Sequence, residues 1–145
     1  MERRELLLGA GALAFSTIAA SAFGAEHTHD HMHHGNAQNQ GLIDATADCV
    51  KKGQACLNHC LDLLAQGDKE MAACARTVSQ MLATCGALEQ LSSLNSKHVA
   101  KMAKVVAGVC QECEDECRKH EKKHAECKAC ADSCAECLKE CNKAV

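Results

Sequence analysis

Apolar residues and cysteines recur at intervals of three and four from residue 42 to residue 143. Because an α-helix turns once in about 3.6 residues, this spacing places them on one face of a helix and places Lys, Glu and Gln on the opposite face. The chain contains no Pro, and residues that favour helices, such as Ala, Leu, Lys and Glu, dominate this range. The pattern therefore predicts an all-α domain.

Three breaks divide this range. Gly67 followed by Asp68 is typical of a helix end and the start of the next helix. A cluster of Ser and Asn residues ends at Ser96, which is expected to cap the following helix. The polar run at residues 118–126 coincides with a change in the phase of the cysteines. Short loops favour an antiparallel, up-down-up-down four-helix bundle over residues 42–145. The predicted helices lie near residues 42–66, 69–91, 97–119 and 124–143.

The cysteines all fall within the predicted helices, and in each helix they occupy one stripe no wider than about 80°. Apolar residues such as Val78, Leu88 and Val106 share these stripes, which face the core of a bundle. Thirteen thiols are therefore expected to line the core: Cys49, Cys56, Cys60, Cys74, Cys85, Cys110, Cys113, Cys117, Cys127, Cys130, Cys134, Cys137 and Cys141.

The first 24 residues are predicted to be an export signal, with a charged start, an apolar run at residues 6–20 and small residues suited to a signal peptidase. The apolar run is shorter than the roughly 20 residues that a membrane-spanning helix needs. The adjacent Arg3 and Arg4 resemble a twin-arginine signal, which exports folded proteins, and Sec export is the alternative. A periplasmic or other extracytoplasmic location is expected.

Composition narrows the range of partners. Removal of the predicted signal takes two Arg and two Glu and leaves the net charge at -3, without a basic cluster. Nucleic acid and anionic lipid are therefore not expected as partners. The predicted bundle contains no aromatic residue, so Leu, Val, Ala, Met and Cys must form its core.

Buried cysteine often serves only as a small apolar residue. A core of so many small side chains, however, would leave voids that each cost about 1 kcal/mol per methyl-sized volume. Disulfides are common in exported cysteine-rich chains, but the cysteine count is odd, and bridges between neighbouring helical turns close loops too small to stabilise much. We therefore favour metal binding, because bound ions would fill the space between the small side chains.

Sites made only of thiolates select soft ions, chiefly Cu(I), zinc or iron–sulfur clusters. The loop-borne cysteine run of bacterial iron–sulfur proteins is absent. Zinc with four thiolates carries a net charge of about -2, which is costly to bury repeatedly. Bridging thiolates hold about one Cu(I) each without net charge. A zinc or general metal-detoxifying protein, and an iron–sulfur or thiol redox carrier, remain alternatives. No catalytic constellation is visible, so the chain is not expected to be an enzyme.

Four C-x3-C pairs are spread along the predicted helices: Cys56/Cys60, Cys113/Cys117, Cys130/Cys134 and Cys137/Cys141. This arrangement resembles the bacterial copper storage proteins over residues 42–143, and the predicted signal matches their exported branch. The resemblance implies a homotetramer of bundles, Cu(I) held by thiolates within and between helices, and a role in buffering copper for copper-dependent enzymes. Cys74 and Cys85 depart from the paired pattern, so other helices must complete their ligation.

Antiparallel topology places the loop near Gly67 and the loop near Glu121 at one end of the bundle. That end collects four residues with metal-binding side chains: His59, Met71, His120 and His124. Copper is expected to reach the core there, with His59 and Met71 as the strongest candidates. The opposite end, near Asn95, is expected to be apolar because it collects Leu88, Leu91, Val99, Met102, Val105 and Val106.

Residues 25–41 form a predicted flexible tail that carries five of the nine histidines. The tail is polar and lacks the periodicity of the bundle. Histidine-rich tracts bind metal ions, so the tail is a candidate for gathering copper.

Overall fold

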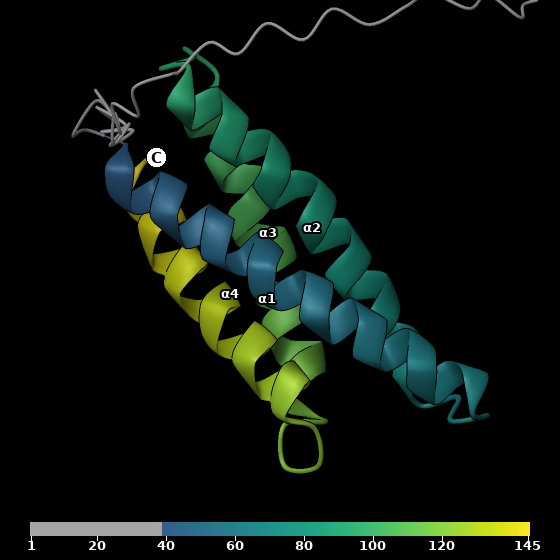
Figure 1. The fold of residues 1–145 in the computed structure, drawn as a ribbon. Helices are drawn as coiled ribbons and strands as arrows, with labels where there is room; N and C mark the ends of the chain where they lie inside the picture. Colours follow the sequence, from purple (N-terminus) through teal and green to yellow (C-terminus); the bar gives the residue numbers. More distant parts are fainter. Residues whose placement is uncertain (1–38) are drawn as a thin grey trace, which may run out of the picture. The chain divides into compact units, whose positions relative to one another are not determined.

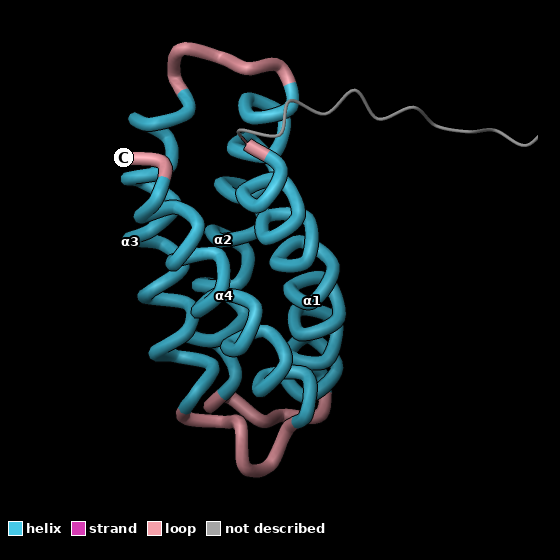
Figure 2. The backbone as a smooth tube through the Cα atoms, turned by 90° about the vertical axis from the view of Figure 1, so that its left-hand side faces the viewer, coloured by secondary structure: helices cyan, strands magenta, loops and turns pink. Residues whose placement is uncertain are grey.

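The computed structural model describes residues 39–145, which form four α-helices and, within that range, no strand. α1 packs against α2 and α4, and α3 packs against the same two helices, so the four helices form an antiparallel bundle with loops at both ends (Figures 1 and 2). The predicted all-α fold is confirmed. The predicted signal and residues 25–38 of the predicted tail lie outside the described residues, whereas Gln40 and Gly41, the last two residues of the predicted tail, belong to the first helix. The helices are α1 (Gln40–Ala65), α2 (Met71–Ser93), α3 (Val99–Arg118) and α4 (Ala125–Lys143).

The end of α1 has the geometry predicted from the sequence. Gly67 adopts a φ of 95°, a left-handed conformation that glycine reaches without a steric penalty. Its N–H donates to the Leu64 carbonyl at 3.0 Å, and the Asp68 N–H donates to the Leu63 carbonyl at 3.0 Å. These two hydrogen bonds satisfy carbonyls that would otherwise lack partners at the helix end.

The end of α2 uses the same geometry without a glycine. Asn95 adopts a φ of 50°, and the Ser96 N–H donates to the Leu91 carbonyl at 2.9 Å. Asn tolerates this conformation better than most residues. The Ser96 hydroxyl accepts a hydrogen bond from the His98 N–H at 3.2 Å in the turn that precedes α3, whereas the capping residue of α3 is His98, without a side-chain capping bond, and not Ser96 as predicted.

α2 and α3 each begin two residues later than the sequence predicts. The Asp68 carbonyl accepts from the Met71 N–H at 3.4 Å, and the Ser96 carbonyl accepts from the Val99 N–H at 3.1 Å. Both bonds span three residues rather than four, so a tighter turn precedes the regular helix.

The core contains the cysteine stripes and a limited set of larger apolar side chains. Val78, Met81, Leu88 and Val106 are fully buried, and side chains such as Leu82 pack against them from partly exposed positions. No helix among residues 39–145 combines the length and the apolar character needed to span a membrane.

Gly53 allows α1 to approach α2 closely. A Cβ at this position would lie 2.5 Å from Met81 Cε and 2.9 Å from Leu82 Cδ2. Gly108, on α3, has no atom within 4 Å of the corresponding position. Replacement of a helical glycine by alanine favours the helix by about 1 kcal/mol, whereas overpacking costs about 1–3 kcal/mol.

We therefore expect Gly108→Ala to stabilise the reduced, metal-free protein by up to about 1 kcal/mol, and Gly53→Ala to destabilise it by about 1 kcal/mol. Urea unfolding followed by circular dichroism measures both changes. Equal stabilisation by the two substitutions would show that α1 and α2 are not in tight contact at Gly53.

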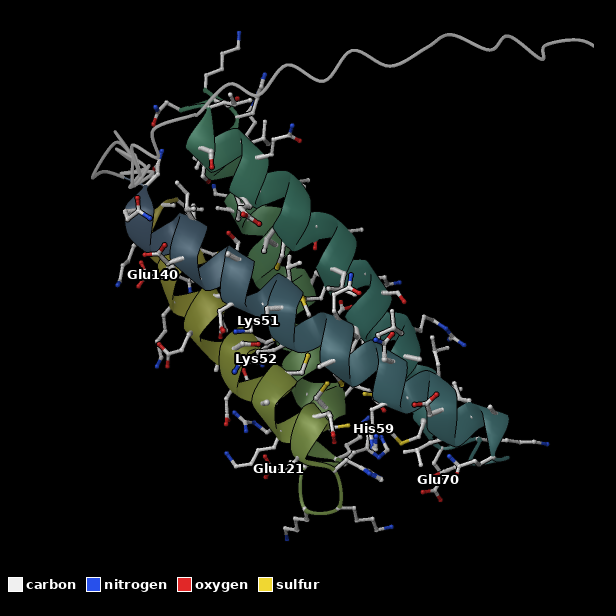
Figure 3. All side chains as sticks on the ribbon, viewed as in Figure 1. Lys51, Lys52, His59, Glu70, Glu121 and Glu140 are labelled. Atoms are coloured by element: carbon white, nitrogen blue, oxygen red, sulfur yellow. The ribbon has the colours of Figure 1, made fainter. Side chains whose placement is uncertain are left out.

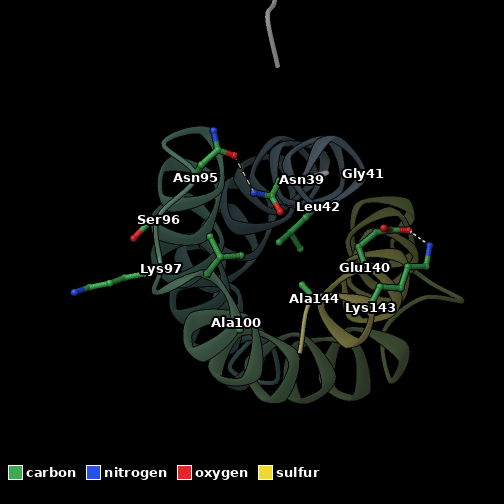
Figure 4. A pocket seen from close by; sticks show the side chains of 11 residues that line it. Asn39, Gly41, Leu42, Asn95, Ser96, Lys97, Ala100, Glu140, Lys143 and Ala144 are labelled. Carbon is green, nitrogen blue, oxygen red and sulfur yellow. Dashed lines mark hydrogen bonds and ion pairs between the residues drawn. The ribbon is translucent and has the colours of Figure 1, made fainter. Parts of the chain in front are cut away.

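The end of the bundle near Asn95 differs from the apolar end predicted. A pocket of about 450 Å³ opens there, with polar residues around an apolar floor (Figure 4). Val105 is 53% exposed because it lies on the outer face of α3, one residue before the buried Val106. The ends of α1 and α4 and the α2–α3 loop bring polar residues to this pocket that the predicted apolar end did not include: Asn39, Asn95, Lys97, Glu140 and Lys143.

The first described residue also lies at this end, which we call the asparagine end. Asn39 Nδ2 donates to the Ser92 carbonyl at 3.4 Å and to Asn95 Oδ1 at 3.3 Å. The predicted histidine-rich tail is therefore joined to the bundle at the end opposite His59.

Candidate metal centre

The thirteen cysteines, all within the described residues, are free thiols with no solvent exposure. Their sulfur atoms lie between the helices, inside the bundle (Figure 3). Neighbouring sulfurs are separated by 3.6 Å, as between Cys74 and Cys117, to 4.0 Å, as between Cys113 and Cys130. These separations far exceed a disulfide bond of about 2.05 Å. They match the distance of about 3.8–4.0 Å between two sulfurs that share an ion through metal–sulfur bonds of about 2.3 Å.

Most of the thiols form compact groups in which the sulfurs all lie within 4.8 Å of one another. Two groups contain four thiols and two contain three. Cys56 and Cys130 each belong to two groups, so three of the groups are linked through shared sulfurs. The groups are Cys49/Cys85/Cys110/Cys137, Cys56/Cys60/Cys74/Cys127, Cys56/Cys117/Cys130 and Cys113/Cys130/Cys134.

The groups bring together cysteines that are distant in sequence. Cys85, on α2, lies 3.7 Å from Cys110, on α3, in a group that draws one thiol from each helix. Cys74 is grouped with thiols of α1 and α4. The two cysteines that lack a partner in their own helix thus have partners on other helices, as the sequence argument required.

Cys141 lies at one margin of this arrangement. Its sulfur is 3.9 Å from Cys137, but it belongs to none of the compact groups. It follows Glu140, which lines the pocket at the asparagine end.

Hydrogen bonds between the thiols lower the pKa of some of them and raise the pKa of others. Hydrogen bonds from Cys134 and Cys137 lower the pKa of the Cys110 thiol to about 6. The pKa of Cys85 is raised, first by its hydrogen bond to Cys110 and further by burial. A protonated thiol that donates to a thiolate keeps its own proton. The core therefore contains thiols that lose their protons more readily than usual and thiols that retain them, and metal ions would displace the retained protons.

The opposite end from Asn39 carries the predicted histidines, and we call it the histidine end. His59 Nε2 lies 2.9 Å from His124 Nδ1 and 3.8 Å from Glu126 Oε2. Figure 3 shows His59 near this end of α1. His120 is engaged separately: its Nε2 lies 3.6 Å from Glu116 Oε1 and makes no hydrogen bond.

Met71 is 1% exposed at the start of α2, one turn before Cys74. Met71 and the histidines lie at one end, as predicted, but Glu126 was not among the predicted site residues. Its signal was present in the chain: Glu126 directly precedes Cys127, as His59 directly precedes Cys60.

A comparison with curated protein sequences finds no match. Among solved structures, Cu(I)-bound copper storage protein BsCsp3 is 27% identical, with a TM-score of 0.66, and the match covers 72% of this chain and 95% of that chain. The copper storage protein Ccsp from Streptomyces lividans, loaded with 10 copper equivalents, is 25% identical, with a TM-score of 0.67 and coverage of 76% and 87%.

Apo-Csp3, copper storage protein 3 from Bacillus subtilis, is 26% identical, with a TM-score of 0.64, and the match covers 73% of this chain and 97% of that chain. The sequence model of the family described as "Copper storage protein" matches residues 35–145, which include the whole bundle and all thirteen cysteines. The chain belongs to the copper storage protein family.

Proposed function

We propose that this protein stores copper as many Cu(I) ions bound by its core thiolates, at about one ion per cysteine. The observation that supports this function most directly is the set of buried thiols whose sulfurs form overlapping groups within 4.8 Å. A thiol catalyst uses one distinguished, activated nucleophile, whereas these thiols are many and all buried. We therefore assign the protein a storage role without catalytic activity.

The sharing of sulfurs favours Cu(I) over zinc. Cys56 and Cys130 each belong to two groups, which suits thiolates that bridge two ions. A bridged Cu(I) thiolate core approaches charge neutrality, so it avoids the desolvation cost of buried dianionic zinc sites. Zinc has one feature in its favour, the two four-thiol groups, and would fill about two such sites.

The proposal extends to the whole chain and its surroundings. Residues 1–24 direct export by the twin-arginine route, the histidine-rich tail runs from residue 25 to the start of α1, and the bundle forms the store. Folded export would protect the reduced thiols from an oxidising exterior. The family resemblance supports a homotetramer that supplies a copper-dependent enzyme.

Titration of the reduced protein with Cu(I) against a competing chelator tests the storage function. We expect about one ion per cysteine, hence close to the cysteine count of 13. A parallel zinc titration should saturate near two ions. One or two Cu(I) ions per chain would instead indicate a chaperone or sensor, and visible absorbance of the purified protein would favour an iron–sulfur carrier.

Copper uptake is proposed at the histidine end, through His59 and Met71. His59 is partly exposed beside Cys60, and the buried Met71 lies one turn from Cys74, so together they offer a path of borderline and soft ligands from solvent to thiol.

The double substitution of His59 and Met71 by Leu should slow Cu(I) loading by roughly tenfold while the capacity stays unchanged. Leu preserves the volume of Met, so the fold should persist. Stopped-flow measurement of copper transfer from a chelator gives the rate. His98→Leu, at the exposed opposite end, is the matched control. An unchanged rate in the double variant would remove the uptake assignment.

A further inference from the structure

Three ligand atoms lie at the histidine end outside the thiol core, two of them close to the third, His59 Nε2. They are His59 Nε2 on α1, His124 Nδ1 directly before α4 and Glu126 Oε2 in the first turn of α4. The side chain of His59 is 26% exposed and that of Glu126 is 42% exposed. The side chains of His59 and Glu126 are therefore accessible to an ion from solvent and partly shielded from water.

We propose that these three atoms bind a divalent cation of borderline softness, typified by Zn²⁺, and that this ion closes the histidine end. Two imidazoles and a carboxylate are a known zinc ligand set, with water in the fourth position. They differ in kind from the thiolates of the core, which prefer Cu(I).

The two separations from His59 Nε2 are close to those around such an ion. Tetrahedral zinc with bonds of about 2.0–2.2 Å holds its ligand atoms about 3.3–3.5 Å apart. The separations of 2.9 Å between the two ring nitrogens and 3.8 Å between His59 Nε2 and the Glu126 oxygen lie on either side of this range. Side-chain rotations that move these atoms by a few tenths of an ångström bring both separations into this range.

The present hydrogen bond between the rings does not oppose binding. One ring nitrogen donates a proton and the other accepts it, in whichever tautomers the pair adopts. An ion that binds both His59 Nε2 and His124 Nδ1 needs a lone pair on each of these nitrogens. The ring that now donates must therefore carry its proton on its other nitrogen. The imidazoles remain neutral, and the carboxylate of Glu126 offsets part of the charge of the ion.

The site lies beside one of the thiol groups that are proposed to bind copper. His59 and Glu126 directly precede Cys60 and Cys127, and these two thiols belong to the same four-thiol group. A bound ion would tie α1 to α4 beside that group and would occupy His59. The effect on copper movement rests on the proposed function, whereas the binding of the ion does not.

The first experiment isolates the site by using the full chain loaded with Cu(I), so that the thiolates are already occupied. Titration with Zn²⁺ against a chelator should show one ion per chain, independent of protein concentration. Glu126→Gln and His124→Gln should each weaken binding by at least about tenfold, whereas His98→Gln at the other end should leave it unchanged. No binding, an unaltered affinity in both variants, or zinc shared between two molecules would overturn the site.

A spectroscopic arm identifies the ligands. Co²⁺ in place of Zn²⁺ should give the visible bands of a tetrahedral ion without the charge-transfer absorption of thiolate ligands. Strong thiolate absorption would overturn the assignment. If the chain fails to load copper, the storage function fails, and the difference between the Co²⁺ spectra of the metal-free wild type and His124→Gln tests the site separately.

A kinetic arm tests the closing effect. Zinc at saturation should slow the removal of Cu(I) by a chelator severalfold in the wild type and have no effect in Glu126→Gln. Equal rates with and without zinc in the wild type would overturn the closing effect while leaving the zinc site in place.

Discussion

Copper loading is expected to raise the midpoint of thermal unfolding by more than about 20 °C relative to the reduced, metal-free protein. The metal-free core is weak for a physical reason: its fully buried larger side chains are few, chiefly Met71, Met81 and Leu88, and the bundle has no aromatic residue. Thirteen of its buried positions are thiols, which contribute less apolar area than Leu or Phe.

Each ion that binds only the folded chain adds about 2.7 kcal/mol when its free concentration is 100 times its dissociation constant. Three such ions add about 8 kcal/mol, and 1 kcal/mol shifts the midpoint of a domain of this size by about 4–8 °C. Circular dichroism during heating measures the midpoint, and a Cu(I) chelator should return it to the metal-free value. Equal midpoints would show that copper binds outside the core or binds the unfolded chain equally well.

Loss of the Cys130 thiol is expected to lower the number of bound Cu(I) ions more than loss of the Cys141 thiol. The Cys130 sulfur belongs to two groups, with Cys56 and Cys117 and with Cys113 and Cys134, whereas Cys141 belongs to none. Serine oxygen is a poor ligand for Cu(I). Cys130→Ser should therefore lower the Cu(I) capacity by about two ions, and Cys141→Ser by about one at most.

The two substitutions are well matched because both thiols are fully buried on α4, so the cost of burying a hydroxyl is similar in each. Competition titration of both variants beside the wild type gives the capacities, and circular dichroism checks that each remains helical. An equal loss in the two variants would show that the ions do not follow the shared sulfurs.

The sequence alone predicts the helices and the face that each one buries. This is possible because the apolar stripe repeats with the helical period, and a buried stripe must face another helix. It also identifies Gly67 as a helix end, since few other residues adopt its left-handed backbone without strain. Asn95 performs the same task at the end of α2, where the surrounding Ser residues obscured the signal.

The polarity of the asparagine end was predicted wrongly because helix-face arguments treat each helix separately. Leu88 and Val106 are buried there as expected, but Asn39, just before α1, and Glu140, near the end of α4, line the same pocket. Residues so distant in sequence carry no shared local pattern. Their meeting depends on how far each helix extends past its neighbours.

The sequence by itself determined that thirteen thiols lie in the interior of a four-helix bundle, because their spacing matches the helical repeat. Only the tertiary structure decided which thiols meet, such as Cys85 with Cys110, and that Glu126 joins His59 and His124. Those contacts depend on the rotation and axial offset of packed helices. A shift of one residue, about 1.5 Å along a helix and 100° around it, would assemble different groups from the same sequence.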